Sequence, residues 1–175
     1  MPSRANERWT MDFIGDRFDD GKRFRALTVL DMFTREALAI VPGISLTGEK
    51  VVLCLDRVRR MRGAPKSIQV DNGSEFYSKA MDAWAYRHGI QLEFIRPGRP
   101  TDNGHIESFN GKLRDECLNV NVFHTMDDAR HVLEEWRVLY NESRPHRSLR
   151  GMPPSEFARA ITSDQGVPAA KSSNA

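Results

Sequence analysis

The feature that most constrains the fold is a change in the spacing of apolar residues after residue 43. Before that point, apolar and β-branched residues are grouped into three runs with short connections, the first closed by the turn sequence Asp-Asp-Gly-Lys. These runs occupy residues 9–18, 23–33 and 36–43. Three such strands in succession are typical of an antiparallel meander.

Beyond residue 43 the apolar spacing becomes helical and alternates with short strand-like runs. The expected elements are a helix ending near residue 62, a strand at 66–71, a helix at 78–89, a strand at 91–97, a long helix at 102–119 and another helix that begins at Thr125. We therefore predict an α/β fold with a mixed five-stranded sheet, in which three antiparallel strands precede strand–helix alternation and helices cover both faces.

The length of 175 residues is enough for one domain with a substantial core. We expect a short lead-in at residues 1–8, a core at 9–160 and a disordered tail at 161–175, where large apolar residues are scarce. The net charge of +2 does not by itself indicate a nucleic-acid partner. The distribution of charge must carry that inference.

Several classes of protein can be set aside. Cys54 and Cys117 lie far apart without a Cys-x-x-Cys motif, so we expect free thiols in a reducing compartment. The five histidines form no pair with zinc-ligand spacing. The sequence has no apolar run long enough to span a membrane and no signal-peptide pattern, so we expect a cytoplasmic protein.

Three carboxylates occupy positions that a simple fold does not require. Asp12 lies inside the first strand, where an unpaired charge is costly. Asp71 ends a buried strand, a place where ligand sites collect in open α/β sheets. Glu107 lies beside the apolar stripe of the helix at 102–119, in line with Asn103 and Arg114.

Each carboxylate has an ordinary explanation when taken alone. Asp12 can be paired with an arginine, Asp71 can form a turn with Asn72-Gly73, and Glu107 can be a solvated helix residue. Together they are an all-oxygen set, which is the ligand chemistry that Mg²⁺ or Mn²⁺ prefers. Two such ions about 4 Å apart can stabilise the attacking and leaving oxygens of a phosphoryl transfer.

Long motifs around these carboxylates resemble one family. They are WTMDF (9–13), VDNGSEF (70–76), RPGRPTDNGHIESFNGKLRDECLN (96–119) and WRVLYNESRPHRSL (136–149). With 35 residues between Asp71 and Glu107 (72–106), the chain resembles the D,D-35-E superfamily of retroviral integrases. Within it, the chain is most similar to the integrase catalytic core of insertion-sequence transposases of the IS-three type, second reading frame.

The resemblance implies a ribonuclease H-like core in which Asp12, Asp71 and Glu107 are the catalytic and metal-binding residues. It implies a polynucleotidyl transferase that uses two Mg²⁺ (or Mn²⁺) ions to cleave and join DNA strands at insertion-sequence ends. The partners implied are transposon-end and target DNA and further copies of the chain in a homo-oligomer. A nucleoid-associated place in a bacterial cytoplasm follows from that partner.

Basic and polar residues near Glu107 are candidates for DNA contact. They are Asn103, Arg99, Lys112, Arg114, Arg144 and His146, with Arg96 beside them. Alternatives remain for most of them. Asn103 can cap the helix, Lys112 can belong to a solvated face, and Arg144 and His146, with Asn141, can dock the preceding helix instead.

Two other functions remain open from the sequence. One is a nuclease of the same fold that hydrolyses DNA without joining it. The other is a non-catalytic DNA-binding or oligomerising remnant of a transposase. Such transposases carry a helix-turn-helix segment before the core, and residues 1–8 are too few for one, so we expect a core that is inactive in specific end recognition by itself.

Overall fold

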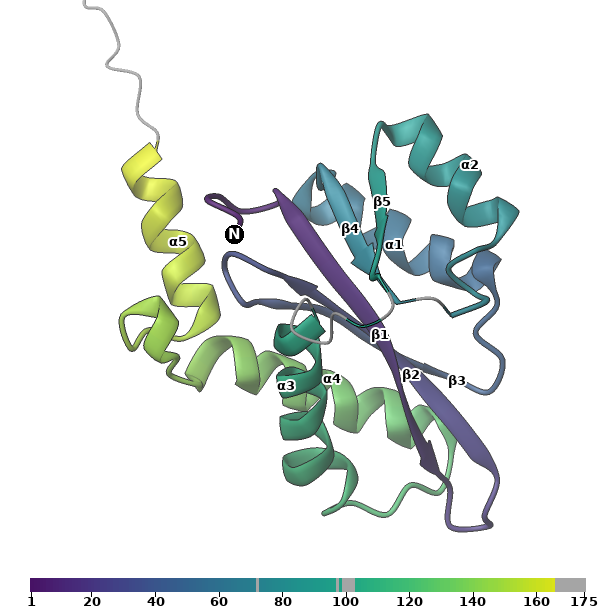
Figure 1. The fold of residues 1–175 in the computed structure, drawn as a ribbon. Helices are drawn as coiled ribbons and strands as arrows, with labels where there is room; N and C mark the ends of the chain where they lie inside the picture. The colour runs from purple at the N-terminus through teal and green to yellow at the C-terminus, as the bar shows by residue number, and fades with distance from the viewer. Residues whose placement is uncertain (72, 97, 99–102, 166–175) are drawn as a thin grey trace, which may run out of the picture.

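The computed structural model describes residues 1–71, 73–96, 98 and 103–165. The elements along the chain are β1 (Arg8–Arg17), β2 (Arg23–Asp31), β3 (Ala37–Gly43), α1 (Gly48–Arg62), β4 (Ser67–Val70), α2 (Lys79–His88), β5 (Gln91–Phe94), α3 (Gly104–Leu113), the π-helical turn η2 (Arg114–Leu118), α4 (Met126–Ser143), the short 3₁₀ helix η3 (Arg147–Leu149) and α5 (Pro154–Gln165) (Figure 1).

The five strands form one mixed sheet in the order β3-β2-β1-β4-β5. β1 pairs antiparallel with β2, and β2 pairs antiparallel with β3, so the first three strands form the predicted meander. β4 pairs parallel with both β1 and β5. The predicted fold class is confirmed.

β4 is much shorter than β1, and this difference creates the place for a site. β4 pairs only with Arg8, Trp9 and Thr10 of β1. Beyond Thr10, no described strand pairs with the β4 side of β1. Asp12 and Gly15 therefore lie on a stretch of β1 whose second edge is open to side chains from α3 and η2.

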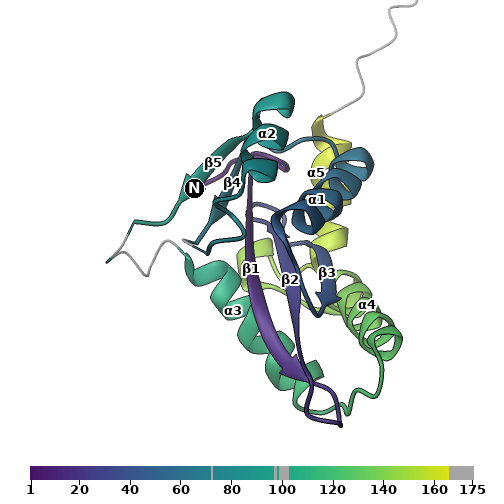
Figure 2. The same cartoon turned by 90° about the vertical axis from the view of Figure 1, so that its right-hand side faces the viewer.

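Two apolar cores cover the two faces of the sheet, because successive side chains of a strand point to opposite faces. Trp9 and Met11 of β1 belong to the core that packs on α1 and α2. Ile14 of the same strand belongs to the core that packs on α3 and α4. The two helical layers can be followed in Figures 1 and 2, as predicted.

The predicted helix ends are partly confirmed. Gly89 closes α2 in the left-handed conformation with φ of 65°, and Thr125 begins α4 with a complete capping box to Asp128. The single helix predicted at 102–119 is helical from Gly104 to Leu118, but it is not a uniform α-helix. α3 ends at Leu113, and Arg114–Leu118 form a π-helical turn, an irregularity that apolar spacing does not reveal.

The C-terminal end also differs from the prediction. α5 runs from Pro154 to Gln165, so the segment predicted as a tail from residue 161 begins inside a helix. Residues 166–175 lie outside the described part. Both cysteines are free thiols, as expected, and none of the described helices is long and apolar enough to cross a membrane.

Candidate active site

Asp12 is held in place from two sides. Its Oδ1 accepts a hydrogen bond from the backbone N–H of Phe13 at 2.8 Å, and its Oδ2 accepts one from Asn110 Nδ2 on α3 at 3.1 Å. The buried Thr28 hydroxyl on β2 lies 3.0 Å from Asn110 Oδ1, which fixes the orientation of that amide. Asp12 is therefore positioned in the sheet by a side chain from the helix that carries Glu107.

Asn110 was not among the residues predicted from the sequence. It follows Glu107 by three residues, and residues with this spacing lie on the same side of a helix. This spacing is the sequence signal from which Asn110 could have been identified. An amide in such a position could not be distinguished from a solvated residue until the register of α3 against β1 was known.

The two other carboxylates act on Asp12 through their charge. Burial raises the pKa of the Asp12 carboxyl above its ordinary value, and the negative charges of Asp71 and Glu107 raise it further. The hydrogen bonds from Phe13 and Asn110 act in the opposite direction. The charges of Asp71, at the end of β4, and of Glu107, on α3, therefore act on Asp12 of β1.

Asp71 is shaped by the turn that follows it. Its Oδ1 accepts a hydrogen bond from the N–H of Gly73 at 2.8 Å. A Cβ on Gly73 would approach the same oxygen to 2.9 Å, closer than real Cβ contacts allow. The turn explanation for Asp71 is therefore correct as local structure, and the same turn aims the carboxylate. Asn72 lies outside the described residues.

Glu107 is in the first turn of α3 and is exposed. It takes part in no hydrogen bond or ion pair among the described residues, so its side chain is free to change rotamer. Across the described ranges, no three His, Cys, Asp or Glu side chains are close enough to hold a metal ion in their present positions. The donor chemistry nevertheless fits Mg²⁺ or Mn²⁺, because all three side chains are carboxylates and the charges of Asp71 and Glu107 act on Asp12.

Arg114 bridges η2 to the open edge of β1. Its Nη2 donates a hydrogen bond to the carbonyl oxygen of Gly15 at 2.5 Å. This places a guanidinium three residues along β1 from Asp12. Arg96 is exposed after β5, and Arg99 lies outside the described residues.

Asn103 stands at the N-cap of α3 but makes no side-chain capping bond. Its Oδ1 is buried without a partner in the described structure. The capping alternative from the sequence is therefore wrong. Lys112 lies on the far side of α3 from Glu107, where it lines a cavity with His105 and Ser108.

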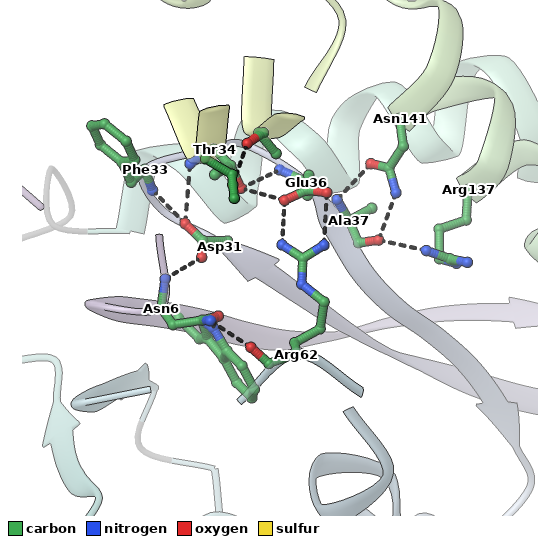
Figure 3. Close-up of polar contacts among 12 residues, drawn as sticks. Asn6, Asp31, Phe33, Thr34, Glu36, Ala37, Arg62, Arg137 and Asn141 are labelled. Atoms are coloured by element: carbon green, nitrogen blue, oxygen red, sulfur yellow. Dashed lines mark hydrogen bonds and ion pairs between the residues drawn. The ribbon is translucent and has the colours of Figure 1, made fainter. Parts of the chain in front are cut away.

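The Tyr-Asn-x-x-Arg-Pro-His motif contributes mainly to docking. Asn141 is buried and forms a two-point contact with Ala37 of β3, accepting from its N–H at 2.8 Å and donating to its carbonyl at 2.9 Å (Figure 3). Arg144 forms a bidentate ion pair with Glu116 of η2 at 2.5 Å. His146 packs edge-on against Tyr140.

A basic groove lies at the far end of β1 and β2, and the sequence did not single it out. It has a volume of about 500 Å³ and is lined by Gly15, Asp16, Arg17, Arg23, Phe24, Arg25 and Arg114. Arg17 and Arg23 lie directly opposite each other on the two strands. Like charges in that relation are destabilising unless an anion compensates them.

Arg25 in the same groove is more firmly held. It forms an ion pair with Glu75 at 2.7 Å, and its guanidinium lies 4.3 Å from the centre of the Phe13 ring. The sequence signal was three arginines around one tight turn. These arginines could be recognised as part of a groove only from the structure, in which η2 places Arg114 beside them.

This sheet order defines a class of fold, the one found in retroviral integrase catalytic cores. The solved structure of the HTLV-2 integrase catalytic core domain in complex with magnesium, in a trimeric form, superposes with a TM-score of 0.68 over 89% of this chain and 97% of that one, at 15% sequence identity. At that identity the likeness concerns the fold.

Sequence comparison identifies the family. Two family signatures, both described as integrase core domain, match residues 2–100 and 88–154. The chain belongs to the integrase core domain family, and the resemblance inferred from its motifs is confirmed.

Proteins of insertion elements are among its relatives. An uncharacterized 31.7 kDa protein of insertion element IS407 from Burkholderia multivorans is 48% identical over 97% of this chain, and an uncharacterized 39.2 kDa protein of insertion element IS476 from Xanthomonas euvesicatoria is 45% identical over 93%. The chain spans 61% and 47% of the lengths of these two proteins.

Proposed function

We propose that the chain is the catalytic core of a transposase that cleaves and joins DNA strands at the ends of an insertion sequence. The observation that supports this proposal is that Asp12, oriented by Asn110 and the Phe13 amide, is acted on by the charges of Asp71 and Glu107. Membership of the integrase core domain family and the insertion-element relatives support it.

In this proposal Asp12, Asp71 and Glu107 hold two Mg²⁺ or Mn²⁺ ions, which when bound activate the attacking oxygen and stabilise the leaving oxygen of the phosphodiester. Asn110 keeps the Asp12 carboxylate turned toward α3, and Gly73 leaves room for that of Asp71. Glu107, which is exposed and makes no hydrogen bond to a described residue, would have to turn toward the other two carboxylates to take part. The magnesium complex of the HTLV-2 core is consistent with this use of the fold.

The DNA backbone would follow the open edge of β1. Arg114 and the basic groove formed with Arg17, Arg23 and Arg25 provide positive charge that begins beside Asp12 and extends to the β1–β2 turn. DNA contacts of Asn103 and Arg96 stay predictions, as does that of Arg99, which lies outside the described residues. For Arg144 the ion pair with Glu116 favours docking over DNA contact.

Joining two DNA ends requires more than one active site, so we propose a homo-oligomer on DNA. The trimeric form described for the HTLV-2 core is a precedent for self-association of this fold. Recognition of specific ends would belong to sequence that the longer insertion-element relatives have in addition.

A branched DNA substrate tests the proposal without requiring end recognition. A recessed 3′-hydroxyl placed beside the branch can attack the neighbouring phosphodiester, and the resealed strand is separated from hydrolysis products by length on a gel. With Mn²⁺ or Mg²⁺ we expect resealed product from the chain. We expect a loss of at least 100-fold in Asp71→Asn and none in Asp115→Asn, which alters an exposed carboxylate on η2.

The outcome separates the alternatives. Hydrolysis products without resealing would indicate a nuclease of the same fold. No reaction, combined with DNA binding that neither metal nor Asp71→Asn affects, would indicate a non-catalytic remnant. Equal activity of Asp71→Asn and the unaltered chain would contradict the assignment of the three carboxylates.

A further inference from the structure

A second polar cavity lies on the far side of α3 from Glu107. It has a volume of about 210 Å³, is partly open to solvent and is lined by the start of β1, the β2–β3 turn, α3 and the segment after α4. The lining residues that matter here are Thr10, Arg35, His105, Lys112 and His146. Asn110 contacts Asp12 from the other side of the helix, and none of the three carboxylates lines this cavity, so it is separate from the proposed active site.

Unpartnered polar atoms converge on this cavity. Only four buried side-chain nitrogen or oxygen atoms in the described part of the chain lack a hydrogen-bond partner. Three of them, Thr10 Oγ1, Arg35 Nη1 and His146 Nε2, belong to residues that line the cavity. Thr10 is 1% exposed. Buried polar groups are nearly always satisfied in folded proteins, so three such atoms in one place indicate a missing partner.

The fold holds Arg35 at the cavity in a strained conformation. Its φ is 62°, in the left-handed region that residues other than glycine rarely adopt. The turn is fixed by the Asp31 carboxylate, which accepts hydrogen bonds from the N–H groups of Phe33 and Thr34 and from that of Asn6 (Figure 3). Observed strain of this kind is a reason to ask what the residue does.

The charge of the cavity is positive. Arg35 and Lys112 line it, and neither forms an ion pair with a described residue. The Asp31 carboxylate in the wall is already occupied by three backbone N–H groups. Burial lowers the pKa of His146 to about 4, and the charges of Lys112, Arg144 and Arg35 contribute. Waters could satisfy the hydroxyl and the imidazole, but only an anion would also neutralise the positive charge of Arg35 and Lys112 that the Asp31 carboxylate leaves over.

We propose that this cavity binds a phosphate-class oxyanion, with Arg35 and Lys112 providing charge and the Thr10 hydroxyl and the His146 Nε2–H donating hydrogen bonds. The cavity is several times larger than the roughly 30 Å³ that one water occupies in the liquid, so a tetrahedral anion fits with accompanying water. A free phosphate and a DNA phosphodiester present the same oxygens. The site does not depend on the proposed catalytic function.

The direct test is a titration of the full chain with inorganic phosphate at constant ionic strength, with NaCl as the balancing salt, followed through the imidazole NMR signals. We expect the signals of His146 to shift saturably. Those of His131, which is exposed on α4 and paired with Glu135, should not. Absence of a saturable shift at His146 would overturn the proposal.

A matched pair of variants locates the site. Arg35→Gln should weaken phosphate binding at least 10-fold. Arg150→Gln removes the same charge from a residue with nearly the same backbone conformation, φ of 58°, outside the cavity, and should leave binding unchanged. If Arg35→Gln does not fold, Lys112→Gln on α3 replaces it. Equal weakening by the cavity and control variants would also overturn the proposal.

A short DNA oligonucleotide distinguishes the two sources of the anion. Competition between the oligonucleotide and phosphate for the His146 shift would support the site with a phosphodiester as its ligand. Phosphate binding that the oligonucleotide does not displace would support the site with a free phosphate or phosphomonoester. Asp71→Asn should leave either result unchanged, so failure of the catalytic assignment would not be mistaken for failure of this one.

Discussion

At the scale of single residues, only a few hydrogen bonds position each carboxylate of the proposed active site. Asp12 has two hydrogen-bond partners, Asp71 has one, and Glu107 has none among the described residues. Because the number of hydrogen bonds falls in this order, the fold positions Asp12, whereas the position of Glu107 depends on what binds. The partner of Asp12 that can be removed without altering the backbone is Asn110.

Asn110→Ala should therefore weaken divalent-cation binding by about 10- to 100-fold, the usual effect of removing a residue that orients a metal ligand. Alanine favours the helix, so stability should fall little. Calorimetry with Mn²⁺ measures the effect. Asn121→Ala, which removes an amide bonded to the Cys117 carbonyl outside the site, is the matched control. Equal binding by Asn110→Ala and the unaltered chain would show that Asp12 needs no such support.

His146 predicts how stability depends on pH. Its pKa is lowered by burial from 6.5 to about 4 in the folded chain. Between these two pH values the unfolded chain binds more protons than the folded chain. The contribution of neutral His146 to stability is therefore present above pH 6.5 and is lost as the pH falls toward 4. His105, whose pKa burial also lowers, acts in the same direction. In urea unfolding, the free energy of unfolding of His146→Asn should fall less between pH 6.5 and 4.5 than that of the unaltered chain. An identical fall in both proteins would refute this role of His146.

At the scale of elements, caps and close contacts join the helices to the sheet. The capping box of Thr125 and Asp128 begins α4, and Asn141 docks the other end of that helix on β3. The π-helical turn η2 contacts both the edge of β1 and the residue that follows α4. It carries Arg114 to the edge of β1 and Glu116 to Arg144.

Thr125→Ala should lower the free energy of unfolding by about 1 kcal/mol, because the hydroxyl satisfies the N–H of Asp128 at the helix start. Thr162→Ala removes a hydroxyl that only bonds back to the Ala158 carbonyl within α5 and should change stability by less than about 0.5 kcal/mol. Denaturant unfolding compares the two. A larger effect of Thr162→Ala would contradict the role given to the cap.

The element scale also shows what the sequence could predict. The strands, the helices and the cap at Thr125 could be predicted because each is a local pattern, and the family could be predicted from its long motifs. The roles of the three carboxylates stay predictions. The end of α3 could not be predicted, because Leu113 and Cys117 keep helical spacing through the π-helical turn. Asn110 and the basic groove could not either, because each depends on which segments the tertiary fold brings together.

At the scale of the whole molecule, α3 separates two polar regions of opposite character. One side carries Glu107 and Asn110 toward Asp12, where negative charge accumulates. The other side carries His105 and Lys112 toward Arg35, where positive charge accumulates. The basic groove extends the first region toward the β1–β2 turn. A DNA strand on the open edge of β1 would thus meet the carboxylates and the arginines in succession.

The double variant Arg17→Gln/Arg23→Gln should weaken binding of duplex DNA and lower the steepness of its salt dependence. Each phosphate contact contributes about 0.9 to the slope of log K against log salt, so the loss should be about 2. The matched control is Arg57→Gln/Arg60→Gln in the second half of α1. Fluorescence anisotropy at several salt concentrations measures both, and an equal loss in the control would indicate a diffuse charge effect instead of a groove.

Calorimetry of Mn²⁺ binding decides whether the three carboxylates form a metal site, and it should compare the unaltered chain, Asp71→Asn, Glu107→Gln and the exposed control Asp115→Asn. The account predicts saturable binding to the unaltered chain and to the control, and binding at least 10-fold weaker to both site variants. Binding of equal strength to all four proteins would show that Asp71 and Glu107 do not hold the metal with Asp12, and the proposed active site would have to be abandoned.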